Sequence, residues 1–164
     1  MKILNEKQIA QKIQRIAVQI LENNFDASEI ILVGINNNGF EVARLLCETL
    51  RQRSLIEINL IRLRLNPSSP ADHPITLDIP VVSLNDKVIV LVDDVVNTGR
   101  TIFYAVKPLL EILPKKVELA VLVDRKHKSF PIQADYVGLS LATTRKENIE
   151  VRLSDEGERG AFLN

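Results

Sequence analysis

The sequence predicts an α/β fold in which a central, mostly parallel sheet is flanked by helices. Three short runs are apolar throughout, as strands covered on both faces usually are: Ile30–Ile35, Val88–Val92 and Leu119–Val123. Segments with helical spacing alternate with these runs, which is typical of strand–helix–strand units in a parallel sheet. The chain has 164 residues, a length that suits a single domain spanning residues 1–164.

The first third of the chain predicts two helices around a strand. Asn5 is a suitable N-cap for the first helix, which Asn23 and Asn24 would end. Its apolar residues recur at three- and four-residue steps and so share one face: Ile9, Ile13, Ile16, Ala17 and Ile20. After the run Ile30–Ile35 we expect a turn at Asn36–Gly39 and a second helix over Glu41–Gln52.

The middle of the chain predicts an irregular strand followed by a loop. Apolar residues alternate from Ile56 to Leu60 and then change phase from Ile61 to Leu65, which suggests a β-bulge. Four prolines and two serines in Leu65–Pro80 predict a loop.

The last third predicts one helix and several strands. Thr101 opens a helix that we expect to run to Leu113, where Pro114 ends it. Later strands are predicted at Tyr136–Leu141 and Asn148–Leu153, and Ser154–Asn164 is expected to form an edge element or to be loosely held.

Composition narrows the possible functions. Twenty-one Lys and Arg balance 21 Asp and Glu, which argues against binding nucleic acid through overall positive charge. The single cysteine, Cys47, excludes an intramolecular disulfide and a multi-cysteine metal site, and we expect it in the core. No apolar run has the length of a membrane span and the N-terminus does not resemble a secretory signal, so we expect a cytoplasmic protein without membrane contact.

The strongest candidate site is the segment VLVDDVVNTGRT, Val90–Thr101. Ligands of parallel sheets bind at the carboxyl ends of strands, where this segment places Asp93 and Asp94. Two adjacent carboxylates can accept hydrogen bonds from sugar hydroxyls or hold a divalent ion indirectly. The turn that follows offers backbone N–H groups to a phosphate, and Gly99 allows close approach. A solvated strand end followed by a capped helix is the alternative that spacing alone leaves open.

This segment resembles the phosphoribosyl-diphosphate (PRPP) signature of the type I phosphoribosyltransferases, which has four apolar residues, two acids, two apolar residues and a turn with Thr-Gly. Leu119–Val151 and the segment ILVGI…NGFEVARLL are similar to the pyrimidine-regulating uracil phosphoribosyltransferases of that family. The resemblance implies the type I phosphoribosyltransferase fold with a small hood, a homo-oligomer (dimer or tetramer), and transfer of phosphoribosyl from Mg²⁺-bound PRPP to a nucleobase, uracil first.

The resemblance also implies a role for particular residues. It implies that Asp93 and Asp94 bind the ribose hydroxyls and act in catalysis. It implies that PRPP is bound at its 5′-phosphate by Asn97, Thr98, Gly99, Arg100 and Thr101. The pyrophosphate loop corresponds to Asn36, Asn37, Asn38 and Gly39. The hood segment that reads the base corresponds to Val123, Asp124, Arg125, Lys126 and His127. No side chain is expected to ligate a metal directly.

Three positions depart from the family pattern. The pyrophosphate loop of the pyrimidine-regulating members follows a Lys-Thr-Arg-Gly pattern, whereas the asparagines of Asn36–Gly39 donate hydrogen bonds but carry no charge. Asn97 stands where purine-specific members carry an acid, which weighs against a 6-oxopurine. The Leu65–Pro80 loop is shorter than the family's lid. Arg62 matches a family arginine.

Other readings remain open at this point. The uncharged loop and the short lid also suit a nucleotide-sensing regulator with weak or no catalysis. RNA could contact the basic cluster Arg125–Lys128, although the neutral overall charge disfavours this and a solvated turn is the simpler interpretation. Gly34 and Gly39 have the spacing of an ATP-binding P-loop, but Phe40 replaces its lysine. A phosphoacceptor of the response-regulator type would have its acid pair early in the chain.

Overall fold

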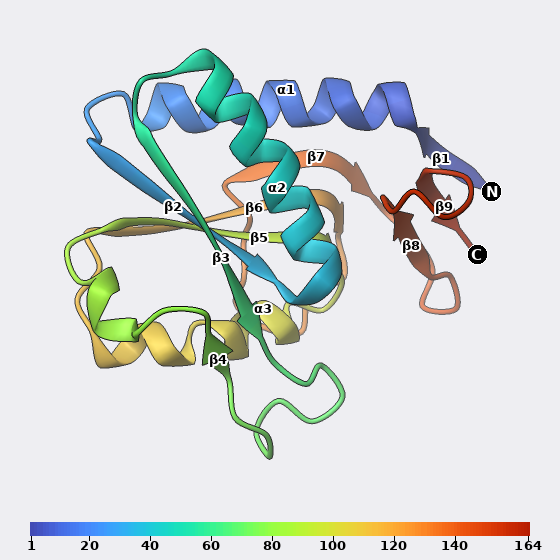
Figure 1. Cartoon of the computed structure of the whole chain (residues 1–164). Helices are drawn as coiled ribbons and strands as arrows, with labels where there is room; N and C mark the ends of the chain where they lie inside the picture. Colours follow the sequence, from blue (N-terminus) through green and yellow to red (C-terminus); the bar gives the residue numbers. More distant parts are fainter.

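The computed structural model describes residues 1–164 and has a six-stranded sheet at its centre (Figure 1). The strands lie in the order β4-β3-β2-β5-β6-β7. They are β2 (Glu29–Ile35), β3 (Glu57–Arg64), β4 (Thr76–Leu77), β5 (Val88–Val96), β6 (Lys116–Arg125) and β7 (Tyr136–Leu141). All neighbours pair in parallel except β3 and β4. The predicted mostly parallel sheet is confirmed.

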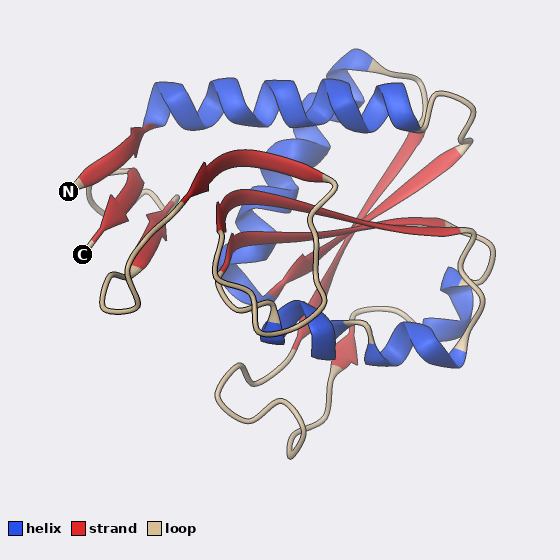
Figure 2. Ribbon diagram, turned by 180° about the vertical axis from the view of Figure 1, so that it is seen from behind, coloured by secondary structure: helices blue, strands red, loops and turns tan.

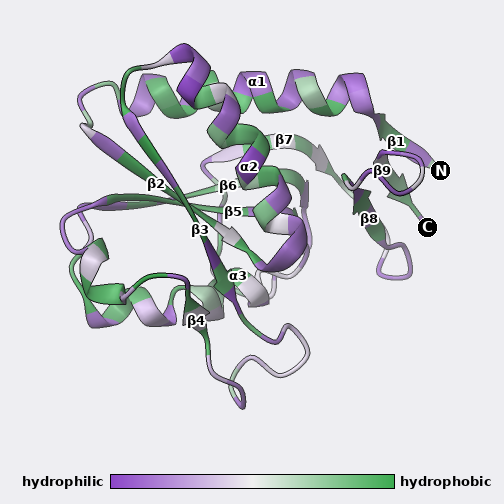
Figure 3. Cartoon of the chain, viewed as in Figure 1, coloured by the Kyte–Doolittle hydropathy of each residue, from purple (hydrophilic) through white to green (hydrophobic).

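Helical segments cover both faces of this sheet, as the view from behind shows (Figure 2). One face packs against α1 (Glu6–Asn23) and α2 (Asn36–Arg53). The other packs against α3 (Arg100–Ala105) and two short 3₁₀ helices, η1 (Val81–Leu84) and η2 (Lys107–Glu111). This double cover explains why the central strands are apolar along most of their length (Figure 3). None of the helices combines the length and the apolar character needed to cross a membrane.

A small antiparallel sheet forms the predicted hood and joins the two ends of the chain. Its strands are β1 (Lys2–Asn5), β9 (Gly160–Leu163) and β8 (Ile149–Arg152), in that order. The tail beyond Ser154 supplies β9, which pairs with strands on both sides, so it is the central strand of this sheet and neither the edge element nor the loosely held segment that the sequence predicts. The sequence also does not predict β1. Leu4, Val151 and Ala161 of this sheet are buried in the same core as α1, so the hood shares the main core.

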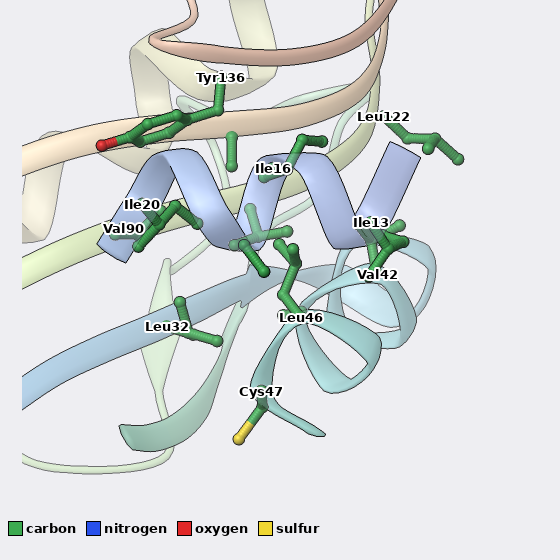
Figure 4. Close-up of a cluster of buried hydrophobic side chains, with 14 of the residues drawn as sticks. Ile13, Ile16, Ile20, Leu32, Val42, Leu46, Cys47, Val90, Leu122 and Tyr136 are labelled. Atoms are coloured by element: carbon green, nitrogen blue, oxygen red, sulfur yellow. The ribbon is translucent and has the colours of Figure 1, made fainter. Parts of the chain in front are cut away.

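The core beneath α1 and α2 shows why the first helix forms where the sequence predicts it (Figure 4). Ile13, Ile16 and Ile20 of α1 are buried together with Leu46 of α2. Each fully buried side chain of this size contributes about 1.5–3 kcal/mol. Asn5 caps the helix: its side chain accepts a hydrogen bond from the backbone N–H three residues on, in a reciprocal capping box. Cys47 is buried and free, as predicted.

The predicted bulge in β3 is wrong. β3 pairs with β2 in unbroken register from Glu57 to Leu63. Ile58 and Leu60 pack on the side of α1 and α2, whereas Ile61 and Leu63 pack in the opposite core. The apparent change of phase reflects a strand that is covered on both faces, first more heavily on one and then on the other.

The predicted helix Thr101–Leu113 is also wrong, because it breaks in the middle. The α-helix ends at Ala105 and continues only as the 3₁₀ helix η2. Pro108 lies in that second segment and has no N–H to donate to Tyr104, four residues before it. The predicted Leu65–Pro80 loop likewise includes the short strand β4, which pairs with the end of β3.

Candidate active site

The predicted site residues meet at the carboxyl end of the sheet, beside its switch point. From β2 the chain crosses to β3 on one side, and β5 then pairs with β2 on the other side. Ligands of open α/β sheets bind in the crevice at such a point. Two adjoining cavities of about 400 and 390 Å³ lie here, and Pro67, Asp93, Val95 and Thr101 line both. They form one continuous cleft.

The acid pair lies at the centre of this cleft. β5 continues through the pair to Val96, so the acids lie within the strand and not beyond its end. Asp93 is only 8% exposed, and one of its oxygens accepts a hydrogen bond from the backbone N–H of Asp94 at 2.9 Å. Burial and the neighbouring charge of Asp94 raise the pKa of the Asp93 carboxyl well above its usual range. Asp94 is half-buried.

The turn Asn97–Thr101, which the sequence predicts to bind phosphate and is called the phosphate turn below, lines the larger cavity of the cleft. Gly99 has a φ of +88°, a left-handed conformation that other residues rarely adopt. The Thr98 carbonyl accepts hydrogen bonds from the N–H groups of Ser129 and Phe130 at 2.9 and 3.1 Å, which ties the turn to the loop after β6. The Arg100 guanidinium donates to the carbonyl of Pro67 at 2.7 Å and so connects the turn to the proline-rich loop.

The asparagine loop is not the separate turn that the sequence predicts, because Asn36 already begins α2. Each asparagine has its own partner. Asn36 accepts from the backbone N–H of Leu65 at 3.0 Å, Asn37 from the Arg62 guanidinium at 3.3 Å, and Asn38 donates to Asp94 at 3.2 Å. The three amides therefore link α2 to β3, to the loop after it, and to the acid pair.

Gly39 allows α2 to start this close to β5. A Cβ atom on Gly39 would lie 2.7 Å from the carbonyl oxygen of Val92 and 3.1 Å from a carboxylate oxygen of Asp93. Both distances are shorter than ordinary van der Waals contact. The residue that the resemblance assigns to the pyrophosphate loop thus has a packing role in holding the loop against the acids.

The predicted base segment divides between a strand and a loop. Val123, Asp124 and Arg125 end β6 of the large sheet, and Lys126 and His127 follow it, so the segment does not belong to the small sheet.

The solvated turn expected at Arg125–Lys128 is wrong for Arg125, which is 9% exposed. Its guanidinium donates to the Thr143 hydroxyl at 2.7 Å, to Asn97 at 2.8 Å and to the Thr144 and Glu147 carbonyls at 2.9 and 2.8 Å. Its hydrogen bonds tie the phosphate turn to the loop after β7.

Two residues at this site have only a weak signal in the sequence. Pro67 lines both cavities, although the sequence marks it only as one proline among four. Arg62 lies opposite Gly34 in the β2–β3 register, and its guanidinium stacks on the Phe40 ring at 4.0 Å. A charged residue in the alternating pattern of β3 was the available signal for Arg62.

The fold and this cleft define a class of protein. The family model of the phosphoribosyl transferase domain matches residues 1–156, and the chain belongs to this family.

Individual proteins are also similar to this chain and point to one branch of the family. The chain is 37% identical to the bifunctional protein PyrR of Alkaliphilus metalliredigens, over 98% of this chain and 92% of that protein. It is 37% identical to the PyrR of Bacillus subtilis, over 93% and 90% of the two chains, and 39% identical to that of Clostridioides difficile, over 95% and 93%.

Solved structures confirm the fold. The hypoxanthine phosphoribosyltransferase of Trypanosoma cruzi aligns with a TM-score of 0.82 at 17% identity, covering 99% of this chain and 95% of that one. A hypoxanthine-guanine phosphoribosyltransferase of Bacillus anthracis aligns with a TM-score of 0.72 at 20% identity, covering 86% and 82%. The predicted type I phosphoribosyltransferase fold is therefore correct.

Proposed function

We propose that this protein transfers the phosphoribosyl group of PRPP to uracil and releases diphosphate. The observation that carries the proposal is the continuous cleft, which joins a buried acid pair to a phosphate turn on one side and to the asparagine loop on the other. PRPP has the same order of groups, with a ribose between a 5′-phosphate and a diphosphate. The relatives named bifunctional PyrR support uracil as the base.

The acid pair would hold the ribose. Asp94 is the more accessible acid, and its carboxylate can accept hydrogen bonds from neighbouring ribose hydroxyls. Asp93 is buried beneath it and fixes the backbone of Asp94 through its own hydrogen bond. Oriented acceptors of this kind favour a ribose that gains positive charge as the diphosphate leaves.

The residues fit Mg²⁺ brought by the substrate. Mg²⁺ in proteins is usually held by one or two carboxylates together with phosphate oxygens and water. Asp93 and Asp94 line the smaller cavity together, so their carboxylates can hold Mg²⁺ indirectly, through water and through the substrate, as the sequence predicts. Bound there with PRPP, Mg²⁺ would neutralise part of the charge on the departing diphosphate.

The base would lie beside Asn97. Arg125 donates to the Oδ1 atom of Asn97, which leaves the amide nitrogen of Asn97 to donate outward. Such a donor suits a base with carbonyl oxygens, as uracil has. An amide cannot accept a proton as a carboxylate does, which weighs against a 6-oxopurine as the base.

Turnover assays test this proposal. Pure protein is incubated with PRPP, Mg²⁺ and one of uracil, hypoxanthine, guanine or adenine, and the released diphosphate is measured. We expect release with uracil and a loss of roughly 10- to 100-fold in Asp94→Asn, the range for hydrogen bonds to a charged group. Asp26→Asn, an exposed acid outside the cleft, is the matched control. Absence of turnover with every base would overturn the proposal.

A regulator that senses nucleotides is the second candidate. The observation in its favour is that no lysine or arginine lines the cavity at the asparagine loop. Calorimetry would then show that UMP or PRPP binds without turnover. An RNA-binding form would have an affinity for a pyrimidine leader transcript that falls steeply with salt. We also propose a dimer or tetramer, which light scattering would reveal as a mass two or four times that of the chain.

A further inference from the structure

Asn97 lines the larger cavity of the cleft, and only one end of its side-chain amide has a hydrogen-bond partner. β5 and β6 pair in parallel as far as Val96 and Asp124, so the next residue of each chain segment, Asn97 and Arg125, lie beside one another. The Arg125 guanidinium donates to the Oδ1 atom of Asn97 at 2.8 Å. The Nδ2 group of Asn97 makes no hydrogen bond within the chain, and the residue is exposed. Its free end is therefore open to a ligand.

Arg125 determines which end of this amide is free. A guanidinium has donors and no acceptor, so the Oδ1 atom of Asn97 must face it and the Nδ2 group must face away. Beside a neighbour that could also accept a hydrogen bond, the amide could turn over, because its two ends have nearly the same shape. Arg125 thus makes Asn97 present a donor to the cleft and not an acceptor.

Arg125 is itself held from the other side. It is 9% exposed, and it also donates to the Thr143 hydroxyl at 2.7 Å and to the carbonyls of Thr144 and Glu147 at 2.9 and 2.8 Å. These acceptors all lie in the loop after β7. Because the donors of a guanidinium form a rigid planar fork, the group cannot turn away from Asn97 without losing them. The orientation of the amide is therefore fixed before a ligand binds.

We propose that Arg125 and Asn97 together select a base that has a ring carbonyl over one that has an amino group in its place. The inference rests on the proposed function, which puts the base beside Asn97, and it names the residues that choose the base. A uracil carbonyl accepts from the Nδ2 group, whereas the amino group of cytosine would meet a second donor and lose the hydrogen bond that it makes in water. Arg125 is a positioning residue, because it acts through Asn97.

Calorimetry with UMP and CMP tests this inference. The two nucleotides have the same phosphate and ribose, and an amino group in CMP replaces a carbonyl of UMP. We expect the wild-type protein to bind UMP about 10- to 100-fold more tightly than CMP, the range for a polar group left without its partner. Arg125→Gln has an amide that can donate or accept, and it should bring this ratio to within about threefold of one. Arg125→Lys has donors only and should recover most of the ratio.

Two further variants complete the design. Asn97→Asp decides the question if Arg125→Gln does not fold, because Asn97 is exposed and aspartate keeps an oxygen for Arg125. Its other oxygen accepts and does not donate, so CMP should bind at least as tightly as UMP. Thr143→Val is the matched control, since it removes one hydrogen bond of Arg125 and leaves the one to Asn97. The ratio should then stay the same even if both affinities fall.

The outcomes separate this inference from the proposed function. Equal binding of UMP and CMP by the wild-type protein, or an unchanged ratio in Asn97→Asp, would overturn the inference. So would a fall in Thr143→Val as large as that in Arg125→Gln, since the cause would then be loosened packing. Failure to turn over any base, with a ratio that still depends on Asn97, would overturn the proposed enzyme and leave the selectivity assignment standing. Binding of neither nucleotide would overturn both.

Discussion

Two buried carboxylates in neighbouring strands have opposite surroundings. Glu118, near the start of β6, is 7% exposed and fully partnered. It accepts hydrogen bonds from the Asn24 amide at 2.8 Å and the Tyr136 hydroxyl at 2.7 Å, and the Lys116 ammonium lies 3.5 Å away. Burial and the contact with Glu118 raise the pKa of Tyr136, which stays a protonated donor. Asp93, toward the end of β5, is 8% exposed and has no cation beside it.

The comparison shows how the same kind of side chain serves the fold in one place and a ligand in another. Glu118 joins α1, β6 and β7 and satisfies the polar groups of all three elements. Asp93 has another acid as its neighbour and one backbone N–H as its only partner. A site prepared for a ligand generally lowers the stability of the free protein, because its groups are left without partners until the ligand binds.

Removing Glu118, the carboxylate that has hydrogen-bond partners, should have the largest effect on stability. Glu118→Ala removes the acceptor of the Tyr136 hydroxyl and one of the two acceptors of the buried Asn24 amide, which keeps only the Ile20 carbonyl. We expect the free energy of unfolding to fall by about 3 kcal/mol, measured by urea denaturation. Turnover per folded molecule should not change, because Glu118 is distant from the cleft. A loss below 1 kcal/mol would show that the network is not what holds α1 to β6.

Gly39→Ala should have the next largest effect and should affect both fold and site. The added methyl group would lie 2.7 Å from the Val92 carbonyl, so α2 must move away from β5. Overpacking of this kind costs about 1–3 kcal/mol. We expect a lower melting temperature together with weaker PRPP binding.

Asp93→Asn should stabilise the protein near neutral pH. The raised pKa of Asp93 means that the folded state holds its proton more tightly than the unfolded state does. Stability therefore falls as pH rises from the ordinary aspartate range, near 3.9, through the raised pKa. Asparagine removes this loss and keeps an oxygen for the Asp94 N–H. We expect a gain of about 0.5–2 kcal/mol at pH 7.

The pH dependence provides the check on that gain. The difference between Asp93→Asn and the wild-type protein should shrink as the pH falls toward 4 and approach zero near pH ~3, because only below the ordinary aspartate pKa is the wild-type acid protonated in both states. Thermal melts across this range measure it. A constant difference at all pH values would mean that the charge of Asp93 is not its cause.

The sequence predicts well those features that short segments determine. The amphipathic pattern of α1 and the Asn5 cap depend only on neighbouring residues, and both are confirmed. The helix predicted from Thr101 to Leu113 is wrong because Pro108 lacks the backbone N–H that an unbroken helix needs at that position. The phase of β3 could not be read correctly, because it depends on which elements cover the two faces of the sheet.

In the candidate site, too, some features follow from the sequence and others depend on contacts between distant segments. The meeting of Asn36–Asn38 with Asp93 and Asp94 follows from the topology of a parallel sheet, and the structure brings these residues to one cavity. The partners of individual side chains do not follow from spacing. Buried Arg125 makes four hydrogen bonds, and Arg62 contacts Asn37. All of these contacts join segments that are distant in the sequence.

Arg100→Ala should have the smallest effect and sharpens the division between side chains and backbone at the phosphate turn. In the free protein the Arg100 guanidinium is occupied with the exposed carbonyl of Pro67, and the backbone N–H groups of the turn are what the proposed function assigns to the phosphate. We expect UMP affinity to change by less than about threefold, roughly 0.6 kcal/mol, by calorimetry. Faster proteolysis of the Leu65–Pro80 loop should accompany it, because that loop loses its contact with the turn. A tenfold loss of UMP affinity would instead show that Arg100 leaves Pro67 to bind the phosphate.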